Sequence, residues 1–190
     1  MLKFAITGNI AAGKSEVEKI LKNYGLYVVD TDEIAHEILD NCEEIKSAFD
    51  KFDIITNGKV DRKKLADIVF SDSDLLKKLE NIVHPLVREK LREIFNRDSD
   101  LVFVSVPQLF EAGFETMFDK IVYIYAGKDV RLKRLMQRNN LSENDALTRI
   151  NAQIPDNEKI KKSDFVIENN SGYLELKENV ESFLRNQQIV

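Results

Sequence analysis

Short apolar runs, each bounded by a polar or glycine-bearing turn, recur along the whole chain. The stretches that follow them repeat apolar residues at helical spacing, as Val17, Ile20 and Leu21 do after the first run. Parallel strands need helical crossovers, so this alternation predicts an α/β fold. The expected architecture is a doubly wound, mostly parallel five-stranded sheet, with its ligand site at the carboxyl ends of the strands. The runs of buried-strand type are 2–6, 26–29, 101–106, 121–125 and 165–167.

Two stretches depart from simple alternation. Residues 34–95 have almost entirely helical periodicity, with a turn at Asn57-Gly58 and an interruption at His84-Pro85. We interpret them as a helical insertion. Residues 129–162 predict two basic helices, broken near Asn139-Asn140, that form a lid. The two helices of this lid hold, among other cations, Arg131, Lys133, Arg134, Arg138 and Arg149.

Composition and charge narrow the class of protein. The 190 residues are 43% hydrophobic and 32% charged, a balance typical of a folded domain rather than a disordered chain. Lysine and arginine number 28 against 33 acidic residues, which gives a net charge of −5. Such a chain has no general basic field, so nucleic acid and anionic membranes are not expected partners.

No targeting or membrane-spanning segment is predicted. The apolar start at 1–6 is interrupted by Thr7-Gly8, and no run approaches the ~20 apolar residues that a span requires. A cytoplasmic location is therefore expected. Cys42 is the only cysteine, which excludes an internal disulfide and favours a packing role or an inert surface thiol.

The first predicted strand leads directly into the pattern G-x-x-x-x-G-K-S, from Gly8 to Ser15. This is the pattern of a phosphate-binding P-loop, in which the glycines let successive backbone N–H groups face inward. Lys14 would place a positive charge on the β- and γ-phosphates, and Ser15 would offer its hydroxyl to Mg²⁺. The helix that follows would direct its positive end at the anion. An ordinary glycine turn is a poor alternative in this strand-to-helix context.

Phosphoryl transfer also needs a group that orients or deprotonates the attacking hydroxyl. Asp30 and Asp32 follow the second predicted strand, at the sheet edge where the P-loop opens. Either carboxylate could meet a substrate hydroxyl. The alternative is that Asp30 or Thr31 caps a helix beginning at Glu33, which would leave the other carboxylate for chemistry.

Three further features each have a structural alternative. Pro107 must end the third strand, because it cannot donate to the sheet, and the loop after it either borders a substrate or is a plain turn. His84 is either a site residue or a hydrogen-bonded histidine at a helix kink. Arg134 and Arg138 lie one helical turn apart and can face one phosphate together. For Arg131 and Lys133 we favour a solvated helical face.

Taken in order, these segments resemble the dephospho-coenzyme A kinase family from Leu2 to about Asn170. The P-loop is followed by V-V-D-T-D-E-I-A-H, V-H-P-L-V, V-x-V-P-x-L-F-E, R-L-x-R-L-M-x-R and S-D-F-V-I-E-N-N. The resemblance implies an ATP-dependent kinase that phosphorylates the ribose 3′-hydroxyl of dephospho-coenzyme A, the last step of coenzyme A biosynthesis. It also implies a nucleotide-binding core (1–33, 96–128 and 163–190), a helical acceptor-substrate subdomain (34–95) and a lid (129–162).

The resemblance assigns roles to individual residues. It implies that Asp32 is the catalytic base, that Lys14 and Ser15 have their usual P-loop roles, and that Arg138 closes on the phosphates of ATP. Asn169 would lie near the adenine. The ATP phosphate loop would comprise Ala11, Ala12, Gly13, Lys14, Ser15 and Glu16, and the acceptor would be bordered by His84, Pro107, Gln108, Leu109 and Glu111.

Three positions differ from the usual family pattern. Ala11 replaces a glycine, and a left-handed backbone there would cost about 1 to 2 kcal/mol. Glu16 replaces a threonine; it favours a helix N-terminus but repels phosphate. Gln108 replaces a leucine, which leaves the packing of substrate there open.

Two alternative functions stay open at this stage. One is another small P-loop kinase, acting on a nucleoside, a nucleotide or a shikimate-like acceptor. The other is a nucleotide-dependent switch, but its D-x-x-G and N-K-x-D patterns do not occur in the chain. No obligatory protein partner is expected.

Overall fold

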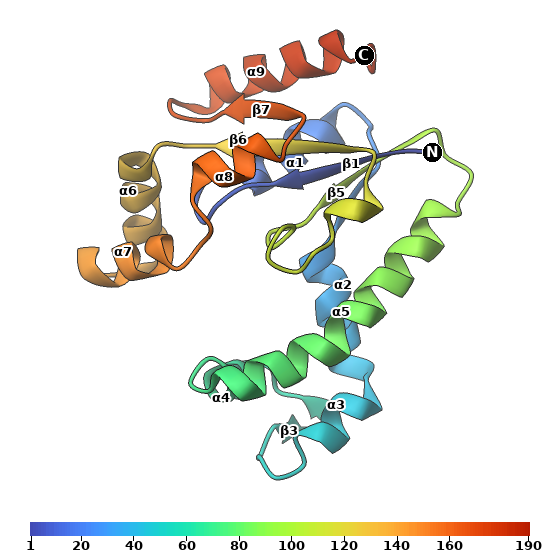
Figure 1. Ribbon diagram of the computed structural model, residues 1–190, viewed down its shortest axis with the longest axis vertical. Helices are drawn as coiled ribbons and strands as arrows, with labels where there is room; N and C mark the ends of the chain where they lie inside the picture. The colour runs from blue at the N-terminus through green and yellow to red at the C-terminus, as the bar shows by residue number, and fades with distance from the viewer. The chain divides into compact units, whose positions relative to one another are not determined.

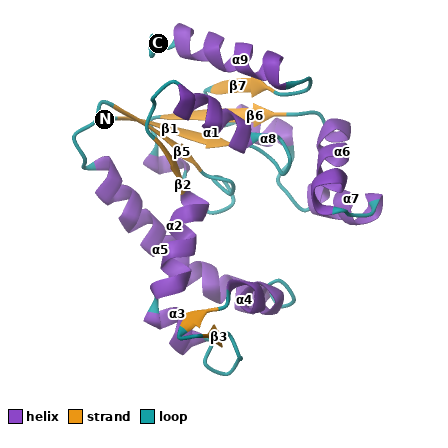
Figure 2. Cartoon of the chain, turned by 180° about the vertical axis from the view of Figure 1, so that it is seen from behind, coloured by secondary structure: helices purple, strands orange, loops and turns teal.

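Two compact units make up the chain in the computed structural model, which describes residues 1–190 (Figures 1 and 2). The first unit comprises Met1–Val29 and Asp98–Val190, and the second comprises Asp30–Arg97. The segment 129–162 belongs to the first unit together with the sheet. The division into core, acceptor subdomain and lid stays a prediction.

A five-stranded sheet forms the centre of the first unit and confirms the predicted fold class. Its order is β2-β5-β1-β6-β7, and the pairs β1–β5, β1–β6 and β6–β7 are parallel. Strand β1 is central: the chain passes from β1 to β2 on one side and later reaches β6 and β7 on the other, so the strand order switches here, as at the ligand site of a doubly wound sheet. The strands are β1 (Leu2–Thr7), β2 (Val28–Asp30), β5 (Leu101–Ser105), β6 (Lys120–Tyr125) and β7 (Phe165–Glu168), with a short 3₁₀ turn η1 (Glu115–Met117) before β6.

One face of the sheet is covered by α1 (Lys14–Asn23) and α9 (Tyr173–Asn186), whose apolar residues share a core with the strands. Figures 1 and 2 both show α9 lying along β7. Phe4 and Phe103 stack with ring centroids 5.0 Å apart, and Phe183 of α9 meets Phe4 edge-on at 5.9 Å. These contacts hold α9 against the sheet whose central strand leads into the P-loop.

The other face is reached by alternate residues of the same strands. Val122 and Ile124 point into the core with α1 and α9, so Tyr123 between them points to the opposite face. There it contacts α8 (Asp156–Lys161) through a hydrogen bond to Asp156. Both faces are therefore covered, as buried parallel strands require.

The segment predicted as two lid helices contains three. They are α6 (Lys128–Asn139), α7 (Glu143–Asn151) and α8. The predicted break is present at Asn140, whose backbone is left-handed with φ 50°. The six residues of α8 are too few to show helical periodicity, so the sequence did not reveal this helix.

The second unit is mainly helical, as predicted, but it also contains a hairpin. Ile55–Thr56 (β3) and Lys59–Val60 (β4) pair antiparallel around Asn57-Gly58. Asn57 and Gly58 have φ of 53° and 78°, the left-handed pair that a two-residue hairpin turn requires. The prediction of a turn was right, and the prediction of helix on both sides of it was wrong. The helices are α2 (Thr31–Asn41), α3 (Glu43–Ala48), α4 (Arg62–Val69) and α5 (Ser73–Phe95).

The predicted interruption at His84-Pro85 is absent, because α5 continues from Ser73 to Phe95 with Pro85 inside it. A proline within a helix costs about 3 kcal/mol. Burial on both sides of Pro85 outweighs this cost, since Val83, Val87 and Leu91 all pack into the interior of the second unit. No helix of either unit is both long enough and apolar enough to cross a membrane.

Candidate active site

The P-loop connects β1 to α1, and its two glycines are required by space and by backbone conformation. A Cβ at Gly8 would lie 2.5 Å from the carbonyl oxygen of Ile124, so the loop passes too close to β6 for any side chain. Gly13 has φ 101°, and a Cβ there would overlap the side-chain amide of Asn169. The sequence predicted both positions correctly as turn glycines of a P-loop.

Lys14 and Ser15 begin α1 at the mouth of this loop. The ammonium of Lys14 lies 2.7 Å from the carbonyl oxygen of Gly8 and so reaches back across the loop. Ser15 is exposed in the first turn of the helix. Backbone N–H groups and the positive end of the helix dipole meet here, an arrangement that suits an anion such as phosphate.

The two departures from the usual loop sequence have different consequences. Ala11 has φ 60°, so it adopts the left-handed conformation at a cost of about 1 to 2 kcal/mol. Glu16 pairs with Lys19, with 2.7 Å between carboxylate and ammonium, in an exposed position. This neighbouring cation offsets part of the repulsion that Glu16 would exert on a phosphate.

Asn169, predicted to lie near the adenine of ATP, contacts the P-loop itself. It is buried, and its amide nitrogen donates to the carbonyl oxygen of Ala12 at 2.8 Å. Its amide oxygen accepts from Arg134 at 3.2 Å, and Arg134 also donates to the carbonyl of Ser171 at 3.3 Å. Asn169 therefore holds the P-loop and an arginine of α6 together.

The arginines of α6 occupy three different environments. Arg138 is exposed and donates to Asn139 at 2.9 Å, so it does not share an acceptor with Arg134 here. Lys133 is exposed, as a solvated face requires. For Arg131 that interpretation was wrong, because its side chain is only 3% exposed and forms an ion pair with Asp156 at 2.7 Å. One face of α6, with Arg131 and Leu135, is buried within the first unit.

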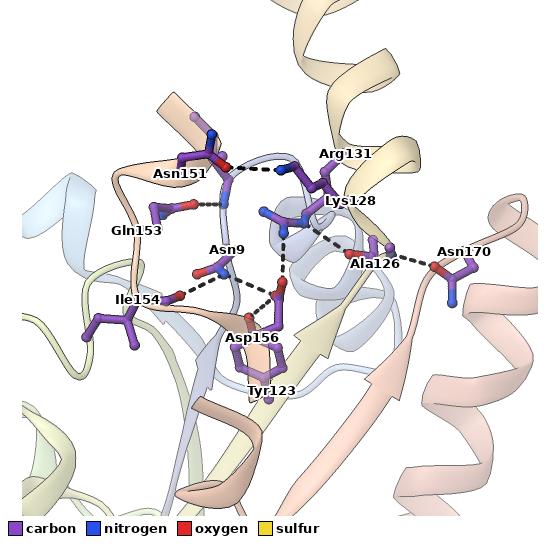
Figure 3. Close-up of polar contacts among 12 residues, drawn as sticks. Asn9, Tyr123, Ala126, Lys128, Arg131, Asn151, Gln153, Ile154, Asp156 and Asn170 are labelled. Carbon is purple, nitrogen blue, oxygen red and sulfur yellow. Dashed lines mark hydrogen bonds and ion pairs between the residues drawn. The ribbon is translucent and has the colours of Figure 1, made fainter. Parts of the chain in front are cut away.

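A polar network centred on Asp156 lies beside the P-loop (Figure 3). One carboxylate oxygen of Asp156 accepts from Asn9 at 3.0 Å and from the Tyr123 hydroxyl at 2.5 Å, while the other accepts from Arg131. Burial and the neighbouring carboxylate raise the pKa of Tyr123, which keeps the phenol a hydrogen-bond donor. The network thus clamps the first half of the P-loop.

Two residues before α8 complete this clamp. The amide of Asn9 donates to the carbonyl of Ile154 at 3.1 Å, and the backbone N–H of Ile10 donates to the side chain of Gln153 at 2.7 Å. The sequence did not reveal the roles of Asn9, Gln153 and Asp156. No local signal could have revealed them, since the partners lie more than 140 residues apart in the chain.

The two aspartates after β2 have distinct local roles in the second unit. Asp30 caps α2 and accepts from the backbone N–H of Asp32 at 2.9 Å. One of the pair therefore caps the helix, as predicted, although the helix begins at Thr31 and not at Glu33. Asp32 is exposed in the first turn of α2.

The residues predicted to border the acceptor are divided between the units. In the first unit Gln108 is exposed after Pro107, Leu109 is buried with 0% exposure, and Glu111 pairs with Lys159. Leu109 therefore packs in the interior of the unit in this structure. In the second unit, burial lowers the pKa of His84, so its imidazole is neutral at pH 7.

A parallel sheet, a glycine loop that closes on a helix N-terminus, and a lysine and serine at that terminus define a P-loop kinase. The family model for dephospho-CoA kinase matches residues 2–175. The dephospho-CoA kinase of Listeria monocytogenes is 37% identical over 187 residues, which are 94% of each chain. The chain therefore belongs to the dephospho-CoA kinase family.

Solved structures agree with this membership. A Thermus thermophilus protein matches with a TM-score of 0.86 and 38% identity, over 98% of this chain and 97% of that one. A dephospho-CoA kinase from Campylobacter jejuni matches with a TM-score of 0.77 and 36% identity, over 97% and 96%. Relatives and structures thus match the chain along almost its whole length.

Proposed function

We infer that this protein transfers a phosphoryl group from ATP to dephospho-coenzyme A, which yields coenzyme A and ADP in the last step of coenzyme A biosynthesis. The family match over residues 2–175 supports this inference most strongly. The P-loop supports it independently, because Lys14 and Ser15 are in place at the start of α1. The acceptor group is the ribose 3′-hydroxyl.

Three residues, Asp32, Lys14 and Arg138, have separate roles in phosphoryl transfer. The 3′-oxygen attacks the γ-phosphorus, the bond from that phosphorus to the β,γ-bridging oxygen breaks, and ADP leaves. Asp32 orients the hydroxyl and accepts its proton, for which an exposed carboxylate in the first turn of α2 is suited. Lys14 neutralises charge on the phosphates, and Arg138, exposed on α6, closes on them from the lid.

The donor set at the loop suits Mg²⁺. Ser15 offers an exposed hydroxyl oxygen, and Mg²⁺ in such sites is held by one or two protein oxygens together with substrate phosphates and water. When bound, Mg²⁺ neutralises charge on the β- and γ-phosphate oxygens. Ser15 is the residue of this chain that would hold it.

The charge of the chain also bears on the partners and the location of the enzyme. Its partner is a small-molecule acceptor, and its net charge of −5 favours neither nucleic acid nor membrane surfaces. We propose a cytoplasmic enzyme that needs no protein partner for activity.

Dephospho-coenzyme A should be phosphorylated far more efficiently than adenosine, AMP or shikimate. The reason is that binding energy from remote parts of a substrate can be used to orient its reacting centre. The helical unit Asp30–Arg97 offers surface for the pantetheine arm that the smaller acceptors lack. A coupled assay of ADP release with this panel of acceptors measures kcat/KM for each.

Mass spectrometry of the product should show one added phosphate, located on the ribose 3′-hydroxyl. If adenosine or shikimate has an equal or higher kcat/KM, the proposed acceptor is wrong even though the P-loop chemistry stands.

Arg138→Ala should lower kcat/KM for ATP by roughly 10²-fold, because only a cation brought onto phosphate stabilises the developing charge. Lys133→Ala is the matched control, since Lys133 is exposed on the same helix. The buried Arg131 is unsuitable as a control, because its loss would leave Asp156 unpaired. Equal, small effects from Arg138→Ala and Lys133→Ala would show that Arg138 is only a solvated residue.

A further inference from the structure

Helix α8 contacts two loops, the P-loop and the loop after β5, and the proposed function needs one site for ATP and one for the acceptor. Its first residue, Asp156, contacts the P-loop, where ATP binds. Lys159, further along the helix, contacts Glu111 in the loop after β5, which the family resemblance predicts to border the acceptor. All of these residues belong to the first unit. A helix of six residues therefore links the two substrate-binding loops within one compact body.

At the ATP end, the carboxylate of Asp156 accepts three hydrogen bonds from three separate elements. Asn9 of the P-loop donates at 3.0 Å, Tyr123 of β6 at 2.5 Å and Arg131 of α6 at 2.7 Å (Figure 3). Tyr123 and Arg131 fix the position of the carboxylate, and the carboxylate in turn fixes Asn9. The path of the P-loop thus depends on the position of α8.

At the acceptor end, two contacts join α8 to a single loop. The ammonium of Lys159 lies 2.5 Å from a carboxylate oxygen of Glu111. The ammonium of Lys162, the residue directly after the helix, lies over the ring of Phe110, 5.7 Å from its centroid. Two neighbouring residues of the loop are therefore held by a lysine of α8 and by the lysine that directly follows the helix.

The Lys159–Glu111 ion pair holds α8 in place at a high cost in desolvation free energy. The side chain of Lys159 has 0% exposure, and that of Glu111 has 26%. Desolvating a buried charge costs free energy that its pairing recovers only in part, and well-packed apolar residues often stabilise a protein as well or better. Stability alone therefore explains this pair poorly, whereas a need to position Glu111 explains it directly.

We propose that α8 is a coupling strut, in which Asp156 positions the P-loop and Lys159 positions the acceptor loop. Any shift of the P-loop on ATP binding is then transmitted through α8 to Glu111, and the reverse holds when the acceptor binds. The two substrates consequently bind with coupled affinities, and by linkage the coupling is equal in both directions. This inference rests on the proposed roles of the two loops.

Lys159→Met is the decisive variant, because methionine keeps the length of the side chain and removes its charge from the buried pair. Isothermal titration calorimetry should measure the Kd of the non-hydrolysable ATP analogue AMP-PNP with and without saturating acceptor. We expect the acceptor to tighten AMP-PNP binding to the wild type by about 5-fold or more. In Lys159→Met this factor should fall to about 1, with the Kd for AMP-PNP alone unchanged.

Three further variants separate coupling from simple structural damage. Glu111→Gln removes the charge of the same ion pair from the side of the loop and should also abolish the coupling. Asp156→Asn should instead weaken AMP-PNP binding itself, because it loosens the clamp on Asn9. Lys161→Met is the matched control, since Lys161 is exposed on α8, and it should keep the coupling of the wild type.

The result that overturns the proposal is an unchanged coupling factor in both Lys159→Met and Glu111→Gln, each shown by circular dichroism to be folded. A wild type without coupling would overturn it equally. The titrations use whichever acceptor of the panel the wild type phosphorylates most efficiently. The outcome therefore decides the role of α8 even if the acceptor is not dephospho-coenzyme A.

Discussion

Lys14→Ala should reduce kcat by roughly 10³-fold or more at saturating ATP and Mg²⁺. The ammonium of Lys14 lies 2.7 Å from the Gly8 carbonyl, inside the loop that would hold the β- and γ-phosphates. Charge on the transferring group grows toward the transition state, so a fixed cation there contributes more to catalysis than to ground-state binding. Steady-state kinetics of ADP release, with folding checked by circular dichroism, measures the effect.

The control is Lys19→Ala, which removes a lysine of the same helix. Lys19 is exposed and paired with Glu16, outside the glycine loop, and its loss should change kcat little. Wild-type turnover in Lys14→Ala would show that the loop is not the phosphate site.

Asp32→Asn should lower kcat by roughly 10² to 10⁴-fold with folding and ATP binding intact. Asparagine keeps the shape of the side chain and removes the charge that accepts the proton of the hydroxyl. The exposed position of Asp32 in the first turn of α2 makes a loss of stability unexpected. Single-turnover measurements would assign the loss to the transfer step itself.

Asp30→Asn provides the matched comparison. Asp30 caps α2 by accepting from the Asp32 N–H, and asparagine is an equally good capping residue. This variant should therefore remain stable and nearly as active as the wild type. If it loses more activity than Asp32→Asn, the role of the base belongs to Asp30.

What the sequence predicted well is what short stretches of chain encode. The strands are contiguous apolar runs, and the P-loop depends on the backbone freedom of Gly8 and Gly13 within one turn. The capping of α2 by one of two adjacent aspartates is likewise a local choice. These features need only neighbours in the chain, so residue type and spacing were enough.

The wrong predictions have two causes. In some places burial outweighed a local conformational preference, and in others the strands were too short to show their periodicity. Pro85 should break a helix, but the apolar face of α5 keeps it continuous. Asn57-Gly58 is a strong hairpin signal, yet its flanking strands have two residues each and carry almost no periodicity. Arg131 resembles any surface cation in sequence, and only the packing of α6 shows that it is buried.

The tertiary structure alone decided which residues support the P-loop. Asn9 meets Asp156, Asn169 meets Ala12, and Lys159 meets Glu111 across long separations in sequence. Hydrogen bonds and ion pairs of this kind depend on distances set by the whole folded unit, and a single sequence contains no period or spacing that records them. The sequence therefore determined the strands and the phosphate loop, and the packing of α8 and β7 against them determined how that loop is held.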